Sequence, residues 1–431
     1  MVDPPVVGNL TGAIEIPPPA EVFMSGIHSL DRVIGDEWPI LATESDLRAF
    51  ESVPYAERIK ASSTYEALKL GAARDPSAAA ILFLPNASAT DEPVRLTHAE
   101  LIGRITQVAN ALHTLGVKSG DVVSLLLPLI PQAFYALFGA QAAGIANPVN
   151  SFLEPAQIAH ILQAAKTKVL IAMGPSEGFD IWEKVSRIRD QLPDLKAILV
   201  VSPWGPPPAG TLSFDAVVSD QPWDRLVSGR DIQASDTSAY YHTGGTTGLP
   251  QLVPLSHGNQ VYQAWGIALM WRTNPGAVLL TALPLFHVGG AITHALQQLA
   301  AGGTLLVLSA AGWRNKNAMP SVWKLVERYR VEVLAAVPTV LGAILNVSME
   351  DTDVSSVRTL TGGGSTVPVP VAEAYKRRFD LEILETYGMT EVSSCHTISN
   401  PARPVYLGSV GHALPYSGVR VVELDHNGKW V

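Results

Sequence analysis

The amino-acid sequence predicts an α/β protein with two lobes built on parallel sheets. Short apolar segments of strand length alternate with amphipathic segments of helix length, which is the pattern of βαβ units. Two such series occur, and the proline-rich stretch 203–208 separates them. Hydrophobic residues make up 47% of the 431 residues and charged residues only 16%, so the chain can bury sizeable cores and is not disordered over most of its length.

The first series opens with a helix over residues 96–116. Apolar residues recur there at intervals of three or four, and Gly116 is placed to close the helix. Residues 121–127 read Asp-Val-Val-Ser-Leu-Leu-Leu, which predicts a buried strand. The series continues with helix 131–144, helix 155–165, strand 168–172, helix 180–191 and strand 197–201.

The second series has the same alternation and then gives way to a different pattern. It consists of strand 278–283, helix 290–301, strand 304–308, helix 319–330 and strand 333–336. Short β-prone segments follow Pro404, such as residues 419–424 with turn residues at 426–428. We expect these segments to begin a small β-subdomain. We also expect the chain to be truncated within this subdomain.

These changes of pattern divide the chain into four parts. Residues 1–65 are rich in proline and are expected to form an N-terminal arm. Residues 66–240 form the first α/β subdomain and residues 241–404 the second, which carries most of the motifs described below. Residues 405–431 form the start of the β-subdomain.

Composition excludes several classes of function. The 39 acidic and 30 basic side chains give a formal charge of −9, which argues against nucleic acid or an anionic membrane surface as the main partner. The single cysteine, Cys395, excludes a disulfide framework and a cysteine-rich zinc site. The first residues contain no basic region followed by an unbroken apolar run, so we expect no secretory signal and a cytoplasmic location.

Two stretches, 122–153 and 273–313, contain no charged residue and are long enough to be mistaken for membrane spans. Prolines, glycines and side-chain amides divide both of them into pieces of strand or helix length. We therefore expect these stretches to lie in the protein core rather than in a membrane.

A loop with three glycines and three threonines is the first motif that could carry chemistry. It follows the β-prone residues Tyr240 and Tyr241, and Pro250 ends it. Backbone N–H groups of glycines can approach an anion closely and threonine hydroxyls add donors, so the loop could hold phosphate groups. It is not a Walker loop. From these residues alone, a flexible surface loop is the favoured interpretation.

Three further motifs are ambiguous when each is taken alone. Glu391, in the run from Glu385, could hold Mg²⁺ through carboxylate and phosphate oxygens, or it could be an ordinary surface carboxylate. His287 lies in an apolar run, where a histidine is usually a core residue. The glycines at 362–364 could form a bare turn or a flat surface for a planar ring.

Together, the four motifs resemble the signature elements of the adenylate-forming superfamily in order and spacing. The phosphate-loop signature of that superfamily reads roughly Y-T-S-G-T-T-G-x-P-K, and this chain has YHTGGTTGLPQ from Tyr241 to Gln251. The Y-G-x-T-E signature is matched by Tyr387, Gly388, Thr390 and Glu391. The resemblance covers residues 65–431. It implies two doubly wound α/β subdomains of the superfamily's large N-terminal domain and the absence of its C-terminal lid domain.

The resemblance implies a two-step ligase, an AMP-forming acyl-CoA synthetase of fatty acid metabolism. A carboxylate attacks the α-phosphorus of ATP, and the acyl-adenylate then passes to coenzyme A. Three candidate catalytic residues follow: Glu391 as ligand of Mg²⁺, Thr390 at the α-phosphate and His287 at the carboxylate pocket. The nucleotide would be held by Thr243, Gly244, Gly245, Thr246, Thr247, Gly248, Gly362, Gly363, Gly364, Thr386, Tyr387 and Gly388, with Tyr387 stacked on adenine.

The sequence departs from the superfamily pattern in three ways. Gln251 replaces the lysine that usually ends the phosphate loop, which removes a charge-assisted contact worth about 1.5–3 kcal/mol. Gly244 replaces a serine, which removes a hydroxyl donor. The ribose-binding aspartate, the hinge and the catalytic lysine of the C-terminal domain would follow Val431. We expect the chain itself to be impaired in catalysis.

Neutral residues surround the expected acid pocket. His287 stands where amino-acid-activating relatives carry an aspartate. Residues 288–291 and 333–338 carry no charged side chain. This predicts a fatty or aromatic acid as substrate rather than an amino acid. The sequence leaves open a carrier protein as acceptor, a binding protein that has lost catalysis, and homo-oligomerisation.

A serine hydrolase is the alternative from another class of enzyme. Residues 174–178 read Gly-Pro-Ser-Glu-Gly, which matches the G-x-S-x-G nucleophile elbow between a strand and a helix. Pro175 stands directly before Ser176, where the elbow needs a sharp, strained turn, and no partner histidine or aspartate is marked by the sequence. We therefore favour the ligase.

Overall fold

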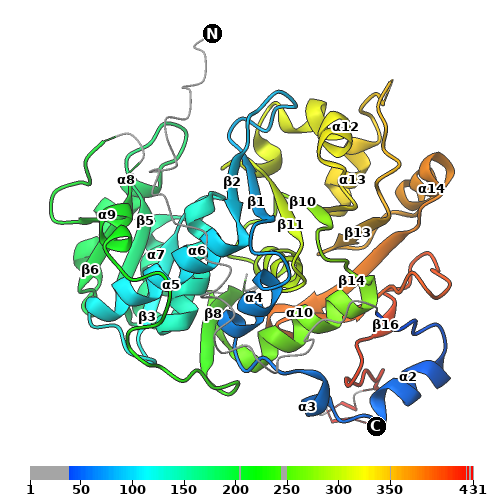
Figure 1. Ribbon diagram of the computed structural model, residues 1–431, viewed down its shortest axis with the longest axis horizontal. Helices are drawn as coiled ribbons and strands as arrows, with labels where there is room; N and C mark the ends of the chain where they lie inside the picture. Colours follow the sequence, from blue (N-terminus) through cyan, green and yellow to red (C-terminus); the bar gives the residue numbers. More distant parts are fainter. Residues whose placement is uncertain are drawn as a thin grey trace.

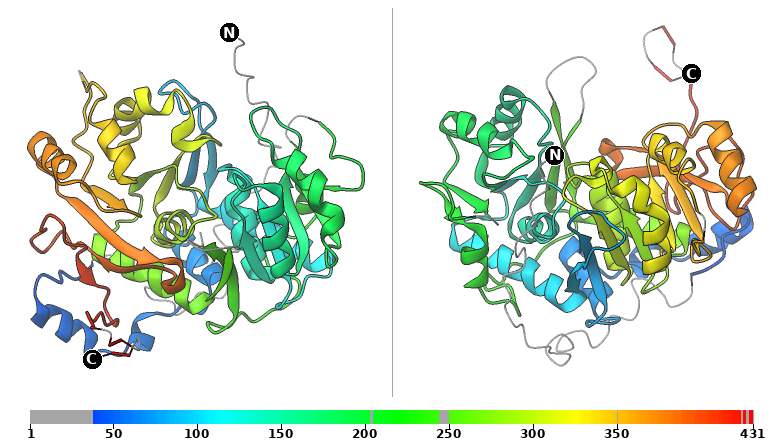
Figure 2. Two further views of the ribbon diagram at one scale, coloured as in Figure 1. Left: turned by 180° about the vertical axis from the view of Figure 1, so that it is seen from behind. Right: turned by 90° about the horizontal axis from the view of Figure 1, so that it is seen from above.

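The computed structural model describes residues 38–202, 205–243, 250–349, 351–423, 425–426 and 429–430. Within these residues the chain forms a seven-stranded and a nine-stranded sheet, both mainly parallel, with helices packed against them (Figure 1). Figure 2 shows the two lobes side by side from two further directions. The α/β class with two parallel-rich sheets, predicted from the sequence, is confirmed.

The seven-stranded sheet contains the first predicted series. Its order is β7-β6-β5-β3-β4-β8-β9, and only β9 runs antiparallel to its neighbour. The strands are β3 (Val122–Leu126), β4 (Ile145–Pro148), β5 (Thr167–Met173), β6 (Ala197–Val201), β7 (Leu212–Ser213), β8 (Thr237–Thr243) and β9 (Gln251–Ser256). The associated helices are α5 (His98–Thr114), α6 (Pro131–Ala143), α7 (Pro155–Ala164), α8 (Ile181–Ile188), the 3-10 turn η1 (Arg189–Gln191) and α9 (Phe214–Ser219).

The nine-stranded sheet contains the second series and has the order β16-β15-β14-β13-β12-β10-β11-β1-β2. Its strands are β1 (Ala79–Leu84), β2 (Val94–Thr97), β10 (Val278–Thr281), β11 (Thr304–Leu308), β12 (Val333–Ala336), β13 (Thr359–Gly363), β14 (Ile383–Met389), β15 (Ser394–Ile398) and β16 (His412–Ala413). Its helical segments are α10 (His257–Trp271), η2 (Gly289–Leu296), α11 (Gln297–Ala300), η3 (Gly312–Arg314), α12 (Ala318–Tyr329), α13 (Pro338–Ile344), α14 (Val369–Phe379) and η4 (Thr390–Val392).

Sheet membership does not follow the expected boundary at residue 240. β1 and β2 precede the first series but belong to the nine-stranded sheet, where β1 pairs in parallel with β11. β9 follows residue 240 but closes the seven-stranded sheet as a hairpin with β8. Strand pairing is a long-range contact that local sequence patterns do not specify, which explains the difference. The division into four parts otherwise remains a prediction.

One expected strand is not formed. Residues 419–423 lie in no strand, and Leu424 lies outside the described residues. Val421 is fully exposed, so this segment has neither a strand partner for its backbone nor a surface against which its side chains could pack within the described chain. The prediction of β structure over residues 419–424 is therefore wrong for residues 419–423.

The uncharged stretches lie in the core, as expected. All 13 residues of α6 are buried, and the largest cluster of buried apolar residues includes side chains from strands of both sheets. A helix buried on every side needs no polar face, which explains why residues 122–153 carry no charge. No helix among the described residues has the length and apolar character needed to cross a bilayer.

The predicted helix over residues 96–116 is α5. Thr97 caps its N-terminus, with Glu100 bonded back to the Thr97 N–H in a capping box. Gly116 follows the helix with φ of 82°, so the glycine ends it in the left-handed conformation as expected.

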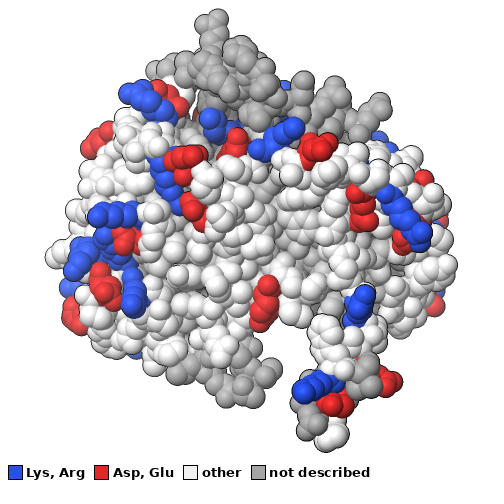
Figure 3. All heavy atoms as spheres, turned by 90° about the horizontal axis from the view of Figure 1, so that it is seen from below, with Lys and Arg blue, Asp and Glu red and all other residues white. Residues whose placement is uncertain are grey.

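Residues 38–61 pack against the segment 400–416, close to the far end of the described chain. They include the short helices α2 (Glu44–Glu51) and α3 (Tyr55–Arg58), and α4 (Thr64–Ala72) follows them. The Arg58 guanidinium donates to the hydroxyl of Tyr416 at 2.7 Å, and the Arg403 side chain donates to the carbonyl of Leu41 at 2.8 Å. On the face drawn in Figure 3, acidic and basic side chains are interspersed around a largely uncharged centre.

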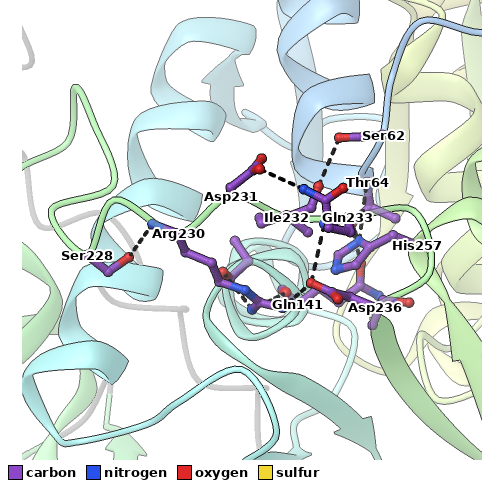
Figure 4. Close-up of polar contacts among 12 residues, drawn as sticks. Ser62, Thr64, Gln141, Ser228, Arg230, Asp231, Ile232, Gln233, Asp236 and His257 are labelled. Atoms are coloured by element: carbon purple, nitrogen blue, oxygen red, sulfur yellow. Dashed lines mark hydrogen bonds and ion pairs between the residues drawn. The ribbon is translucent and has the colours of Figure 1, made fainter.

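A buried polar cluster fixes the start of α10 against α4 and α6 (Figure 4). The backbone N–H of Thr64 donates to Nδ1 of His257 at 3.2 Å, and the Thr64 hydroxyl donates to Gln141 at 2.7 Å. Arg230 donates to the carbonyl of Ala142 at 3.1 Å and forms an ion pair with Asp236 at 3.2 Å. Because α10 continues from this cluster toward the cavity described below, the cluster sets the position of one wall of that cavity.

Candidate active site

A cavity of about 630 Å³ lies at the carboxyl ends of four neighbouring parallel strands, β10, β12, β13 and β14. The end of β8 from the other sheet also reaches it. Ligands of open α/β sheets bind outside the carboxyl ends of the strands. Most of the wall comes from the segments that follow these strands, at residues 283–289, 361–365 and 386–391. Three of the four sequence motifs thus meet at one cavity.

The His287 motif follows β10 and turns sharply into η2. A Cβ atom on Gly290 would lie 2.2 Å from the carbonyl oxygen of Pro284, so only glycine permits this turn. Nδ1 of His287 accepts a hydrogen bond from the Gly289 N–H at 3.0 Å. Burial among the cavity walls lowers the pKa of His287, although part of its ring faces the cavity. His287 is therefore neutral at ordinary pH, with its proton on Nε2.

His242, in β8, is a second cavity histidine to which the sequence assigned no role. Its ring stacks on Phe286 with centroids 6.2 Å apart, and its Nε2 accepts a hydrogen bond from the Asn150 N–H at 3.1 Å. Burial, together with the nearby His287, lowers the pKa of His242 to about 4. The only sequence signal for this residue was its place in the phosphate-loop signature.

The glycines at the end of β13 form a surface without side chains. A Cβ atom on Gly363 would lie 2.2 Å from the hydroxyl of Thr386, whereas the space beside Gly364 is open. Gly364 has φ of 82°, which also favours glycine. Gly363 and Gly364 line the cavity, while Gly362 is buried behind them.

The segment after β14 carries the acidic motif. A Cβ atom on Gly388 would lie 1.5 Å from the carbonyl oxygen of Ser394, so the close pairing of β14 with β15 requires glycine there. Thr386, Gly388, Thr390 and Glu391 line the cavity. Tyr387 does not: its side chain is 48% exposed and stacks on His396 with centroids 6.2 Å apart.

The structure describes the residues on either side of the predicted phosphate loop. Thr243 ends β8 and lines the cavity, and it pairs directly with Gln251 at the start of β9. Gly244, Gly245, Thr246, Thr247 and Gly248 lie outside the described residues. The two residues that flank the loop therefore lie at the rim of the cavity, while the role of the loop's own residues stays a prediction.

The residues that line the cavity are suited to hold the Mg²⁺ that the family resemblance implies. The described residues contain no group of three or more His, Cys, Asp or Glu side chains that could hold a metal. Mg²⁺ is commonly held by one or two carboxylates together with substrate phosphates, and Glu391 is an exposed carboxylate on the cavity wall. None of the described residues that line the cavity is lysine or arginine.

The expected neutral acid pocket is only partly made of the residues named for it. Val288, Gly289, Ala336 and Val337 line the cavity, as the sequence predicted. No sequence pattern indicated a second group of lining residues, which is Trp271, Thr293, His294, Ser394 and Cys395. They come from α10, η2 and β15, and only the fold brings them together.

A second cavity, of about 720 Å³, contains the serine of the hydrolase alternative. Ser176 lines it together with Phe152 and Arg314. The Ser176 hydroxyl is buried and has no hydrogen-bond partner among the described residues. A nucleophilic serine needs a base within hydrogen-bond reach. The described geometry therefore does not support a serine hydrolase.

Comparison with protein families gives one match over most of the chain. Residues 68–430 match the family described as AMP-binding enzyme. A marinolic acid–CoA ligase from Pseudoalteromonas sp. (strain SANK 73390) is 32% identical over 390 residues, covering 89% of this chain and 59% of the relative. A long-chain-fatty-acid–CoA ligase from Yersinia pestis is 30% identical, covering 73% of this chain and 58% of the relative.

A 4-coumarate–CoA ligase from Humulus lupulus is 28% identical, covering 78% of this chain and 60% of the relative. The chain thus spans about three fifths of the length of these relatives. Among solved structures, the anthranilate CoA ligase AuaEII in complex with anthranoyl-AMP has a TM-score of 0.74 at 23% identity, with 87% of this chain and 69% of that one covered. The N-terminal domain of FACL13 from Mycobacterium tuberculosis has a TM-score of 0.71 at 22% identity, with 86% of each chain covered.

Proposed function

Because the chain belongs to the AMP-binding enzyme family, we propose that it activates a carboxylic acid with ATP for transfer to coenzyme A. The acid would be fatty or aromatic. The observation that carries this proposal is the meeting of His287, Gly363 and Glu391 at one cavity, beside the two ends of the threonine- and glycine-rich loop. The cytoplasmic location expected from the sequence remains part of the proposal.

In the first step, a carboxylate oxygen of the acid attacks the α-phosphorus of ATP and pyrophosphate leaves. Such a transfer depends mainly on positioning and on neutralising charge. Mg²⁺, when bound, would neutralise phosphate charge, and the exposed carboxylate of Glu391 is suited to hold it together with phosphate oxygens. The hydroxyl of Thr390 lies beside it on the wall and can donate to a phosphate oxygen.

His287 is suited to orient the acid. Its Nδ1 already accepts from the Gly289 N–H, so the remaining proton lies on Nε2 and can be donated into the cavity. A neutral donor can hold a carboxylate oxygen without forming an ion pair strong enough to reduce its nucleophilicity. The lowered pKa of His287, caused by burial, supports this neutral role.

The names of the relatives and the lining of the cavity both support a fatty or aromatic acid as the substrate. The relatives act, by their names, on marinolic acid, 4-coumarate and long-chain fatty acids. Glu391 is the only Asp or Glu side chain on the described wall of the cavity, and it lies at the nucleotide motif. A substrate ammonium group would therefore lack a dedicated partner at the acid end.

The second cavity is suited to admit the thiol acceptor. Phe152 lines it and packs edge-on against Phe286 of the first cavity, with centroids 6.3 Å apart. The Arg314 guanidinium lies 3.8 Å from the centre of the Phe152 ring and offers a positive charge at the same place. Asp180 and Glu183 line this cavity as well, so the support for coenzyme A as the acceptor comes from the names of the relatives rather than from the charge of the cavity.

Pyrophosphate exchange tests the first step directly. The chain is incubated with MgATP, labelled pyrophosphate and a panel of fatty and aromatic acids. We expect label to enter ATP only when an acid is present, and acyl-hydroxamate to accumulate when hydroxylamine is added. Exchange that does not depend on any acid, or no binding of ATP or AMP, would contradict the proposal.

A further inference from the structure

Polar side chains line the inner part of a cavity whose acid-binding end was expected to be apolar. Thr293 and His294 are adjacent in η2, a π-helix, and they lie four and five residues after Gly289, which is on the same wall. Hydrogen bonds from i to i+5 widen the turn, so positions four and five apart share one face. Short π-helical segments occur frequently at functional sites.

One of the two ring nitrogens of His294 has a described hydrogen-bond partner. Its side chain is 4% exposed, and its Nδ1 is 2.8 Å from the hydroxyl of Thr281, which is buried in β10. The hydrogen bond from Nδ1 is the only one described for this side chain, and none is described for its other ring nitrogen, Nε2. His294 lines the cavity, so a bound molecule can supply the missing partner. Burial lowers the pKa of His294 to about 4, so the ring is neutral.

Two neighbouring groups add to this polar wall. The Thr293 hydroxyl is hydrogen-bonded to the hydroxyl of Ser394, and the Ser394 hydroxyl lies 3.6 Å from the thiol of Cys395. The indole N–H of Trp271 is buried and has no partner among the described residues. Unpaired buried polar groups are costly, and a purely apolar acyl chain would leave both Nε2 and the indole N–H unpaired.

We propose that the acid accepted by this cavity carries a hydroxyl group, which His294 recognises through Nε2. The inference rests on the proposed function and names its substrate class. A hydroxyl fits either arrangement of the Thr281–His294 bond, because it can accept from Nε2–H or donate to an unprotonated Nε2. A second carboxylate does not fit, because no described lysine or arginine lines the cavity to neutralise its charge.

Stable acyl-adenylate analogues test this inference by binding alone. The probes are octanoyl-sulfamoyl-adenosine and its monohydroxy derivatives, phenylpropanoyl-sulfamoyl-adenosine and its 4-hydroxy derivative, and an octanoyl probe with a terminal carboxylate. Calorimetry on the full chain gives each dissociation constant. We expect at least one hydroxylated probe to bind about tenfold more tightly than its parent, which corresponds to one net hydrogen bond.

Variants assign the preference to His294. The variant His294→Leu should remove the preference for the hydroxyl and leave the affinity for AMP unchanged. Because this change leaves Thr281 unpaired, the double variant Thr281→Val/His294→Leu provides a second version in which both partners become apolar. Ile292→Val is the matched control, since Ile292 is buried in the same π-helix but does not line the cavity. It should keep the preference.

Each contrary result has a distinct meaning. If the parent probes bind as tightly as every hydroxylated probe, or if both His294 variants retain the preference, this inference fails while the proposed function stands. Tightest binding of the carboxylate probe would also overturn it. If no acyl probe binds more tightly than AMP, both the inference and the proposed function fail.

Discussion

The side-chain amide of Gln263 is hydrogen-bonded to both the N–H and the carbonyl group of Cys395. Its Oε1 accepts from the Cys395 N–H at 3.0 Å, and its Nε2 donates to the Cys395 carbonyl at 2.9 Å. The same Nε2 donates to the carbonyl of Val392 at 3.0 Å. Gln263 lies in the middle of α10, so this helix fixes the turn that presents Glu391 to the cavity.

Replacing this glutamine should affect the metal dependence of the reaction as well as folding. The variant Gln263→Leu leaves three backbone groups without their partner, at a cost of about 1–3 kcal/mol each if they stay dry. We expect the Mg²⁺ concentration for half-maximal pyrophosphate exchange to rise several-fold, because Glu391 loses its fixed position. Titrating Mg²⁺ in the exchange assay measures this.

Gln298→Leu is the matched control for that variant. Gln298 is also a buried glutamine that donates to a backbone carbonyl, that of Ala277, at 2.6 Å. It does not line the cavity or contact the Glu391 turn. We expect a lower melting temperature with an unchanged Mg²⁺ requirement. Equal Mg²⁺ requirements in both variants would mean that Gln263 is only structural.

Glu391→Gln tests the metal ligand directly. The change removes the charge and keeps the shape, and Glu391 forms no ion pair with a described lysine or arginine. Folding stability should therefore change little, while MgATP-dependent exchange should fall by about 10²-fold or more. Melting temperature and exchange rate are measured on the same preparation, with Glu373→Gln on the exposed face of α14 as control. Unchanged exchange would rule out this role for Glu391.

Local sequence patterns predicted most of the fold because each buried strand and each amphipathic helix carries its own periodicity. The parallel strands β3, β5, β6, β11 and β12 occur within a few residues of their expected ranges. Pairing partners were not predictable in the same way. β1 joins β11 across more than 200 residues of chain, and nothing in residues 79–84 specifies that neighbour.

The site was predictable to a similar degree. Residues of the contiguous motifs, such as Gly363 and Glu391, could be found because one short segment carries the whole signal. His294 could not be found, because its importance depends on the hydrogen bond from Thr281 and on a π-helix that forms only within the packed fold. The exposed Tyr387 ring leaves its stacking on adenine a prediction.

Gln251→Lys should tighten ATP binding. Gln251 is exposed and pairs with Thr243 at the rim of the cavity, where the described wall carries no lysine or arginine. A lysine there would add a charge-assisted contact to a phosphate group in a partly solvated site. We expect a gain of about 1 kcal/mol, or about fivefold in the dissociation constant measured by calorimetry.

The control for this change is Gln191→Lys, which adds the same charge at an exposed position of η1, away from the cavity. It should leave ATP affinity unchanged. If both variants tighten binding equally, the effect is one of net charge. Equal or weaker affinity in Gln251→Lys would mean that this side chain does not reach the phosphates.

The His257 cluster should make folding stability depend on pH. Burial, first among its causes, lowers the pKa of His257 to about 4, against about 6.5 in an unfolded chain. Below pH 6.5 the unfolded chain therefore binds a proton at His257, whereas the folded chain does not bind it until the pH approaches 4. The contribution of neutral His257 is fully present above pH 6.5 and is lost as the pH falls toward 4, by about 2 kcal/mol between pH 6.5 and 5.

Urea unfolding at pH 7 and pH 5 measures this loss. Wild type should lose about 2 kcal/mol more than His257→Gln over that interval, because the variant has no proton to take up at this position. Ser62→Ala is the control: Ser62 donates to the carbonyl of Ile232 in the same cluster at 2.9 Å and does not titrate. It should lower the free energy of unfolding equally at both pH values. If wild type and His257→Gln lose the same amount, His257 is protonated in the folded protein or is not held as the cluster geometry requires.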